Sequence, residues 1–152
     1  MNYYNEIKNI LIDNAIGRKV REYKSNQKDL ESYYNVGKLL VEAQGGEERA
    51  KYGNGLIKEY SKRLTTELGK GYSVRSLTDM RTFYSFCQKR QSLIAEFKFH
   101  NISWTCITKL LKLDDINAIF YYVKCIGKMN LTTRELDSKL KSKEYERLDS
   151  KI

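Results

Sequence analysis

Apolar side chains recur at steps of three and four residues along most of the chain, which is the spacing of amphipathic helices. Proline, which interrupts helices, does not occur among the 152 residues. We therefore expect an all-α protein, a single compact helical domain of about six to seven helices over residues 1–152. The spacing predicts a first helix over 4–16, a long helix over 18–44, a helix-turn-helix-like core over 56–113 and C-terminal helices over 114–148.

The long helix over 18–44 carries a heptad-like seam. Its positions are Val20, Tyr23, Gln27, Leu30, Tyr34, Gly37 and Val41. Gln27 and Gly37 are poor residues for a coiled-coil interface, and the repeat is too short for a sustained coiled coil. A helix packed on its own domain is therefore favoured, and a homodimer through helix 18–44 is the second interpretation.

Local signals predict where several helices begin and end. Gly17 is expected to end or bend the first helix, and Gly127 is expected to end the helix that begins near residue 116. Residues 90–102 break the helical period, so a short extended segment is expected near 93–100. Side chains that can accept hydrogen bonds from helix amides predict N-caps at Ser73, at Ser103, at Asp114 or Asp115, and at Thr132 with Glu135 three residues on.

The charge is strongly basic and unevenly distributed. The formal net charge is +9 and the isoelectric point is near 9.4, which favours phosphate-rich partners or acidic protein surfaces over neutral metabolites. Residues 51–90 contain nine Lys and Arg against three Glu and Asp, so +6 of the +9 lies in this segment. The basic excess therefore surrounds the sequence Gly69-Lys70-Gly71-Tyr72.

This glycine-containing turn joins predicted helices at 56–68 and 73–88, an arrangement typical of a helix-turn-helix. Lys70 and the free amides at the start of the second helix are expected to hold a phosphate. Arg75 and Ser76 are expected to reach base edges, and Arg81 is a candidate for a backbone contact. The predicted nucleic-acid-binding residues are Lys58, Lys62, Arg63, Lys70, Tyr72, Ser73, Arg75, Ser76 and Arg81.

Candidates for catalysis are few. Glu96 and Lys98 form the ExK of a PD-(D/E)xK nuclease, in which carboxylates hold Mg²⁺ and a lysine orients the attacking water. The nearest upstream acid, Asp79, lies in a predicted helix rather than on a partner strand. His100 has no second histidine with which to bind a metal. We therefore predict no enzymatic activity in this chain, no catalytic residue, no metal and no cofactor.

The remaining sequence features concern compartment. Cys87, Cys106 and Cys125 are far apart and outside any CxxC pair, which argues against disulfides and zinc and favours buried thiols in a reducing cytoplasm. No signal peptide and no run of about 20 apolar residues occur. A cytoplasmic protein without a membrane partner is expected.

Five blocks of sequence together resemble a known family. They are YYNVGKLLVEAQGG at 33–46, RAKYGNGLI at 49–57, LGKGYSVRSLTDMRTFY at 68–84, SWTCITKLLKL at 103–113 and LTTRELDSKL at 131–140. In this order they resemble the N-terminal domain of YhcG-like bacterial proteins, domain of unknown function 1016, over about residues 5–140. Two positions depart from the family pattern: Cys106 stands where the family has histidine, and Leu131 where it usually has tryptophan.

The resemblance implies an all-helical domain that usually precedes a PD-(D/E)xK nuclease domain and serves in DNA binding or partner recognition. Catalysis would then belong to the nuclease domain, which would begin where this sequence stops. The leading hypothesis is a non-enzymatic DNA-binding module, with RNA as a further nucleic-acid partner left open. The alternative is an adaptor, inhibitor or dimerisation module that binds the nuclease domain or another protein.

Overall fold

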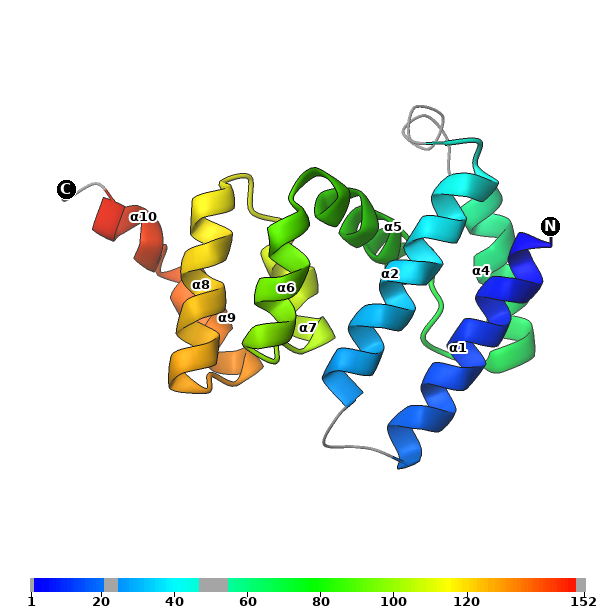
Figure 1. Ribbon diagram of the computed structural model, residues 1–152, viewed down its shortest axis with the longest axis horizontal. Helices are drawn as coiled ribbons and strands as arrows, with labels where there is room; N and C mark the ends of the chain where they lie inside the picture. The colour runs from blue at the N-terminus through cyan, green and yellow to red at the C-terminus, as the bar shows by residue number, and fades with distance from the viewer. Residues whose placement is uncertain (1, 21–24, 47–54, 150–152) are drawn as a thin grey trace. The chain divides into compact units, whose positions relative to one another are not determined.

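The computed structural model describes residues 2–20, 25–46 and 55–149, and every regular element in these ranges is a helix (Figure 1). In chain order the helices are α1 (Tyr3–Val20), α2 (Ser25–Ala43), α4 (Gly55–Leu68), α5 (Val74–Lys89), α6 (Gln91–Phe99), α7 (Trp104–Leu110), α8 (Ile116–Met129), α9 (Thr133–Lys141) and α10 (Glu144–Asp149). The predicted all-α fold is confirmed. The chain divides into two compact units, unit 1 (Met1–Lys89) and unit 2 (Arg90–Ile152). The single domain expected over 1–152 stays a prediction, and each unit is described by itself.

Unit 1 is built around α2, which packs most extensively against α5 and α1 (Figure 1). Helix α4 completes the unit by packing on α5 and α1. The apolar stripe of each helix faces this common interior, which is why the three-and-four spacing of the sequence predicts the helices correctly. The buried apolar side chains of unit 1 are Tyr4, Ile7, Leu11, Leu30, Val36, Leu40, Val41, Ile57, Tyr60, Leu64, Leu77, Met80, Phe83 and Cys87.

Most described positions of the heptad-like seam of the long helix face the interior of unit 1. Leu30 and Val41 are buried. Tyr34 packs edge-on against Tyr84 of α5, with 5.0 Å between ring centroids. Gly37 is buried where α2 meets the backbone of α5. Within the described part of the seam, Leu30, Gly37 and Val41 are buried in unit 1, whereas Gln27 is exposed. A homodimer through helix 18–44 stays a prediction. The side chains of Val20 and Tyr23 lie outside the described residues.

A buried polar network joins α1 to α2. Asn14 and Asp29 are each less than 5% exposed, and the side-chain amide of Asn14 donates to Oδ1 of Asp29 at 2.9 Å. Ser32 donates to the amide oxygen of Asn14 at 3.1 Å, and Arg18 Nε lies 3.8 Å from the same Asp29 oxygen. Burial raises the pKa of Asp29 above its ordinary value, while the Asn14 hydrogen bond and the Arg18 charge oppose that rise.

The predicted helix over 18–44 is wrong at its beginning. Helix α1 passes through Gly17 and ends at Val20, and α2 begins at Ser25. A glycine inside a helix costs only about 1 kcal/mol relative to alanine, which neighbouring packing readily offsets. Residues 21–24, near the beginning of the predicted helix, lie outside the described residues.

Unit 2 places α6 against α8, α7 against α9, and α10 against both α8 and α9. Its interior is made from apolar side chains of α6 to α9 and the turn before α7. These buried residues are Leu93, Phe97, Ile102, Cys106, Ile107, Leu110, Ala118, Ile119, Tyr122, Val123, Ile126 and Leu136.

Two predictions for unit 2 are corrected. The segment near 93–100 is helix α6 rather than extended, because Leu93 and Phe97 lie four residues apart and both enter the core. Gly127 does not end α8, which continues to Met129 and closes with Asn130 in the left-handed conformation. Helices α9 and α10 are separated by a turn at Ser142 and Lys143, where Lys143 has a φ of 53°.

The predicted N-caps are confirmed because cap chemistry is local. Ser103 accepts from the amide of Cys106, and Asp115 rather than Asp114 accepts from the amide of Asn117. Thr132 and Glu135 form a reciprocal capping box.

All three cysteines are free thiols. Cys87 in unit 1 and Cys106 in unit 2 are buried, whereas Cys125 is half-buried. Burial raises the pKa of the Cys87 thiol to about 12. Cys106 Sγ lies 3.8 Å from the hydroxyl of Thr133. In the part of the chain that the structure describes, no helix combines the length and apolarity needed to cross a membrane.

Candidate nucleic-acid interface

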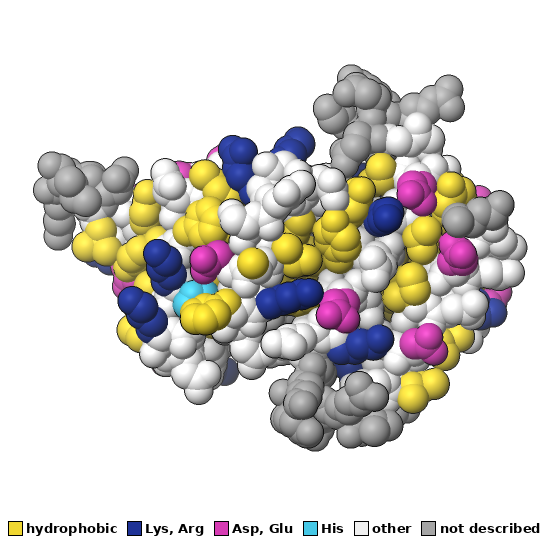
Figure 2. All heavy atoms as spheres, viewed as in Figure 1, with side chains coloured by type: hydrophobic (Ala, Val, Ile, Leu, Met, Phe, Trp, Pro, Cys, Tyr) yellow, Lys and Arg dark blue, Asp and Glu magenta, His cyan; other side chains and the backbone are white. Residues whose placement is uncertain are grey.

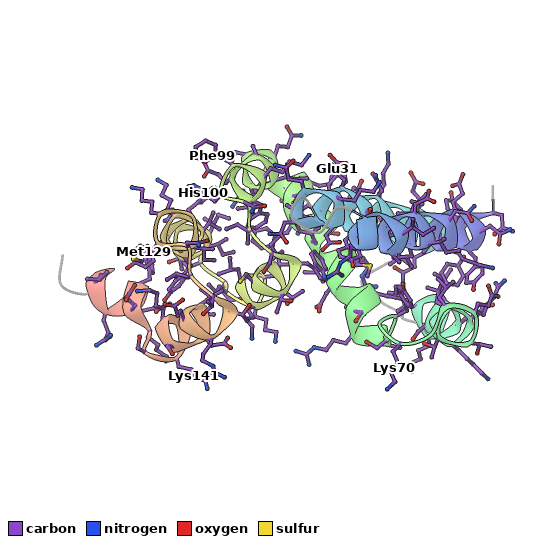
Figure 3. The ribbon with its side chains drawn as sticks, turned by 90° about the horizontal axis from the view of Figure 1, so that it is seen from below. Glu31, Lys70, Phe99, His100, Met129 and Lys141 are labelled. Atoms are coloured by element: carbon purple, nitrogen blue, oxygen red, sulfur yellow. The ribbon has the colours of Figure 1, made fainter. Side chains whose placement is uncertain are left out.

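The turn between α4 and α5 is the first place to look for the predicted interface. The face of unit 1 formed by α1 and α2 carries acidic and basic side chains intermixed (Figure 2). By contrast, Lys70 lies at the edge of unit 1, where Figure 3 shows it pointing away from the helices. It is flanked by Gly69 and Gly71, whose φ values of +98° and +110° are strained for any other residue. The two glycines thus fix a sharp turn with an exposed lysine at its centre.

The beginning of α5 is capped and open to solvent. The Ser73 hydroxyl accepts from the amide of Ser76 at 3.1 Å and also donates to its hydroxyl at 3.1 Å. The predicted N-cap is therefore confirmed, and the amides of Val74 and Arg75 stay outside the helical ladder. Arg75 is exposed, and the first turn contains no acidic residue. This end of α5 combines unpaired amide dipoles with a cationic side chain, which suits an anion.

The turn is held to α4 by a hydrogen bond. Ser61, buried on α4, donates its hydroxyl to the carbonyl oxygen of Tyr72 at 2.7 Å. Tyr72 itself is half-buried. Its backbone therefore contributes to the geometry of the turn, and the position of Lys70 is set by α4 as well as by the glycines.

Two of the predicted lysines share a face of α4. Lys58 and Lys62 are exposed and lie one helical turn apart. They lie outside the buried stripe formed by Ile57, Tyr60 and Leu64. They can extend a basic surface along α4 without disturbing its packing.

Two predicted arginines contact side chains from other parts of unit 1, and their role in binding stays a prediction. The guanidinium of Arg63 lies 3.6 Å from the centroid of the Tyr4 ring, a cation–π contact with α1. Arg81 Nη1 donates to Oε1 of Gln44, beyond the end of α2, at 3.2 Å. Sequence reasoning missed Tyr4 and Gln44 because both are far from the arginines along the chain. The exposed cations of the predicted set that the structure leaves at the turn or on the Lys58 face are Lys58, Lys62, Lys70 and Arg75.

The carboxylate of Glu67, near the end of α4, is paired with a lysine of α1. Glu67 forms an ion pair with Lys8. The hydrogen bond from Lys8 lowers the pKa of Glu67, and the same bond raises the pKa of Lys8. The Glu67 carboxylate therefore stays ionised and paired, and its charge competes less with an anion at the neighbouring turn.

The nuclease-like pair Glu96 and Lys98 lies on helix α6 and not on a strand. Glu96 Oε2 is 3.3 Å from His100 Nε2, so this carboxylate contacts the imidazole. Among the described residues, no group of three His, Cys, Asp or Glu side chains is arranged to hold a metal ion. The strand geometry that the PD-(D/E)xK interpretation requires is thus replaced by a helix.

Comparison with known proteins supports the resemblance found in the sequence blocks. The model of the DUF1016 N-terminal domain family matches residues 7–147. The chain is 30% identical over 165 residues to the Escherichia coli (strain K12) protein named "Putative nuclease YhcG". This alignment covers 90% of the chain and 44% of the relative, so the chain spans less than half of the relative's length. No solved structure matches the chain.

Proposed function

Because this chain belongs to the DUF1016 N-terminal domain family, we propose that it is a non-enzymatic nucleic-acid-binding module that contacts duplex DNA through the α4–α5 turn. The observation that carries the proposal is the exposure of Lys70 and Arg75 on either side of the capped, acid-free beginning of α5. A phosphate placed there would meet two cations, the unpaired amides and the positive end of the helix dipole. Every nucleic-acid backbone carries phosphates that can make these contacts.

The exposed side chains would contact different parts of the nucleic acid. Lys70 and the amides of Val74 and Arg75 would hold one phosphate, while Arg75 is long enough to reach a neighbouring phosphate or a base edge. Lys58 and Lys62 would follow the backbone along α4. Ser73 and Ser76 bond each other and so serve the helix start.

The relative supports the same assignment through its name. A nuclease acts on nucleic acid, and this chain corresponds to only 44% of that protein's length. A division in which this domain contacts the nucleic acid and the remainder cleaves it is consistent with the helical position of Glu96 and Lys98. The proposal therefore assigns binding, and no chemical step, to the residues described.

The test is a duplex-DNA mobility shift over a salt series with the Lys70→Ala/Arg75→Ala variant. Each phosphate contact contributes about 0.9 to the slope of log K against log salt, so we expect the slope to fall by about 1.8 if both contacts are lost. The matched control is Lys28→Ala/Lys38→Ala, which removes two exposed charges from α2 of the same unit. Equal behaviour of the two double variants would contradict the proposed docking, because only net charge would then matter.

A protein-interaction role is the second candidate, and a groove in unit 1 favours it. The groove has a volume of 480 Å³, lies along α1 and α2, and combines the apolar Ile10 and Leu39 with Glu6, Lys38 and Glu42. Light scattering separates the two roles. A monomer that forms a salt-sensitive complex with DNA supports the first, whereas a stable protein complex that ignores DNA supports the second.

A further inference from the structure

Unit 2 contains an open hollow that the proposed duplex interface does not use. It has a volume of 370 Å³ and is lined by Glu96, Phe99, His100, Lys124 and Lys128. These residues come from the C-terminal end of α6 and the second half of α8, two helices that pack together. Figure 2 shows the histidine beside hydrophobic surface, with basic side chains on the same face.

Phe99 is the unusual residue of this hollow because its side chain is 82% exposed. Its backbone is nevertheless fixed by the end of α6. The amide of Ile102 donates to the carbonyl of Phe97 at 3.0 Å, the amide of Asn101 donates to that of Lys98 at 3.1 Å, and Asn101 has a φ of 52°. This pair of bonds is a Schellman motif. A rigid helix end therefore presents an aromatic ring to solvent.

His100 contacts both the Phe99 ring and the Glu96 carboxylate. The rings of Phe99 and His100 meet edge to face with 4.9 Å between centroids (Figure 3). His100 packs directly on Gly127 of α8, where the Cβ of any other residue would collide with the imidazole. Its Nε2 is 3.3 Å from Glu96 Oε2. The acid of the hollow is thus already in contact with a polar partner.

The cations of the hollow are Lys124 and Lys128. Both are exposed and lie one turn apart on α8. Neither has an ion pair with any described residue. The hollow therefore offers one apolar aromatic surface and two ammonium groups beside a single lining carboxylate, Glu96, whose Oε2 faces His100.

We infer that this hollow binds an unpaired nucleotide, whose base stacks on Phe99 while its phosphate lies against Lys124 and Lys128. Base stacking on an aromatic ring and phosphate contact by lysines are the two components of single-strand binding. An acidic peptide would use the lysines but would gain nothing particular from an aromatic plane, and a purely apolar partner would leave both ammonium groups unpaired. This site goes beyond the proposed function, since it lies in unit 2 and concerns single strands instead of duplex.

The aromatic arm of the test uses fluorescence anisotropy with a labelled thymidine oligonucleotide and an abasic strand of equal length. Phe99→Ala is expected to weaken oligonucleotide binding about tenfold, the effect of losing one stacked base. Phe99→Leu keeps apolar bulk without a ring and should bind as poorly, whereas Phe99→Trp should restore affinity. Binding of the abasic strand to the wild-type protein should be as weak as that of the thymidine strand to Phe99→Ala.

The lysine arm compares Lys124→Ala/Lys128→Ala with the control Lys112→Ala/Lys141→Ala, which removes two exposed lysines of unit 2 that do not line the hollow. Figure 3 shows Lys141 away from Phe99 and His100. Each phosphate contact contributes about 0.7 to the salt slope for a single strand, so the first variant should lose about 1.4 and the control almost nothing. A uridine oligonucleotide measured in parallel shows whether DNA or RNA is the better source of the nucleotide.

The inference is overturned if Phe99→Ala and Lys124→Ala/Lys128→Ala bind the oligonucleotide as the wild type does. It is also overturned if Phe99→Leu or the abasic strand binds normally, because the occupant would then be an apolar or acidic partner rather than a base. Thermal melts of every variant verify folding, which an exposed position should leave unchanged. Failure of the duplex proposal is seen separately, as unchanged duplex binding by Lys70→Ala/Arg75→Ala.

Discussion

Replacing Gly37 with alanine is expected to lower the free energy of unfolding of unit 1 by about 3 kcal/mol, at the upper end of the cost of overpacking. The added Cβ would collide with the carbonyl group of Met80 and would lie 2.8 Å from Cβ of Tyr84. The first of these is backbone within α5, so it cannot move aside by rotating a side chain. The helices α2 and α5 would have to separate, and they form the most extensive contact of the unit.

The matched control is Gly17→Ala in α1. There the added Cβ would lie 3.8 Å from the nearest atom, Cγ of Lys28, which is ordinary contact. Because alanine favours a helix over glycine by about 1 kcal/mol, this variant should be more stable than the wild type. Urea unfolding followed by circular dichroism measures both. Similar effects of the two substitutions would contradict the close approach of α2 and α5.

Replacing Asn14 with alanine is expected to destabilise the protein by about 3 kcal/mol at neutral pH, the cost of leaving buried polar groups without partners. The buried carboxylate of Asp29 would lose its 2.9 Å hydrogen bond, and the Ser32 hydroxyl would lose its acceptor. Asn9→Ala, an exposed position on the same helix, should change stability by less than about 0.5 kcal/mol. Equal effects at the two positions would show that the network contributes nothing.

The cost of Asn14→Ala should depend on pH in a defined direction. Burial raises the folded-state pKa of Asp29 above 3.8, so its contribution to stability is fully present below pH 3.8 and is lost as pH rises through the folded pKa. Asn14 lowers that pKa, so removing it raises the pKa further and enlarges the loss above it. The difference between variant and wild type should therefore be smaller in acid, where only the lost Ser32 hydrogen bond remains as a cost, than at neutral pH. Adding Asp29→Asn to both proteins should make the difference independent of pH.

The sequence predicted those parts of the fold that depend on near neighbours. Ser73 and Thr132 cap their helices as expected because the groups they bond lie within three residues. The prediction of an extended segment near 93–100 was wrong. Phe99 was counted with Phe97 as an alternating pattern, but Phe99 is exposed, and Leu93 and Phe97, four residues apart, are the residues of this segment that enter the core. Whether an aromatic residue is buried depends on helices distant in the chain, and periodicity within one segment does not contain that information.

The candidate site, like the fold, was predicted only where it depends on residues close together in the sequence. The concentration of cations around Lys70 is visible in the sequence, and the structure leaves Lys70 and Arg75 exposed beside the helix start. Arg63 and Arg81 were predicted to join them, and the structure adds contacts to Tyr4 and Gln44 that the sequence did not predict. No pattern within one segment predicts contacts with residues as distant in the sequence as Tyr4 and Gln44. The hollow of unit 2 was missed for the same reason, since Phe99 and Lys124 meet only after α6 packs on α8.

The burial of one thiol in each unit makes local opening measurable without any engineered label. Alkylating reagents attack the thiolate, so Cys87 and Cys106 should react only in molecules whose interiors have opened, whereas half-buried Cys125 should be modified sooner. Mass spectrometry of peptides after timed alkylation gives one opening rate for unit 1 and another for unit 2. Equal rates would mean that the units unfold in one cooperative event, and unequal rates would rank their kinetic stabilities directly.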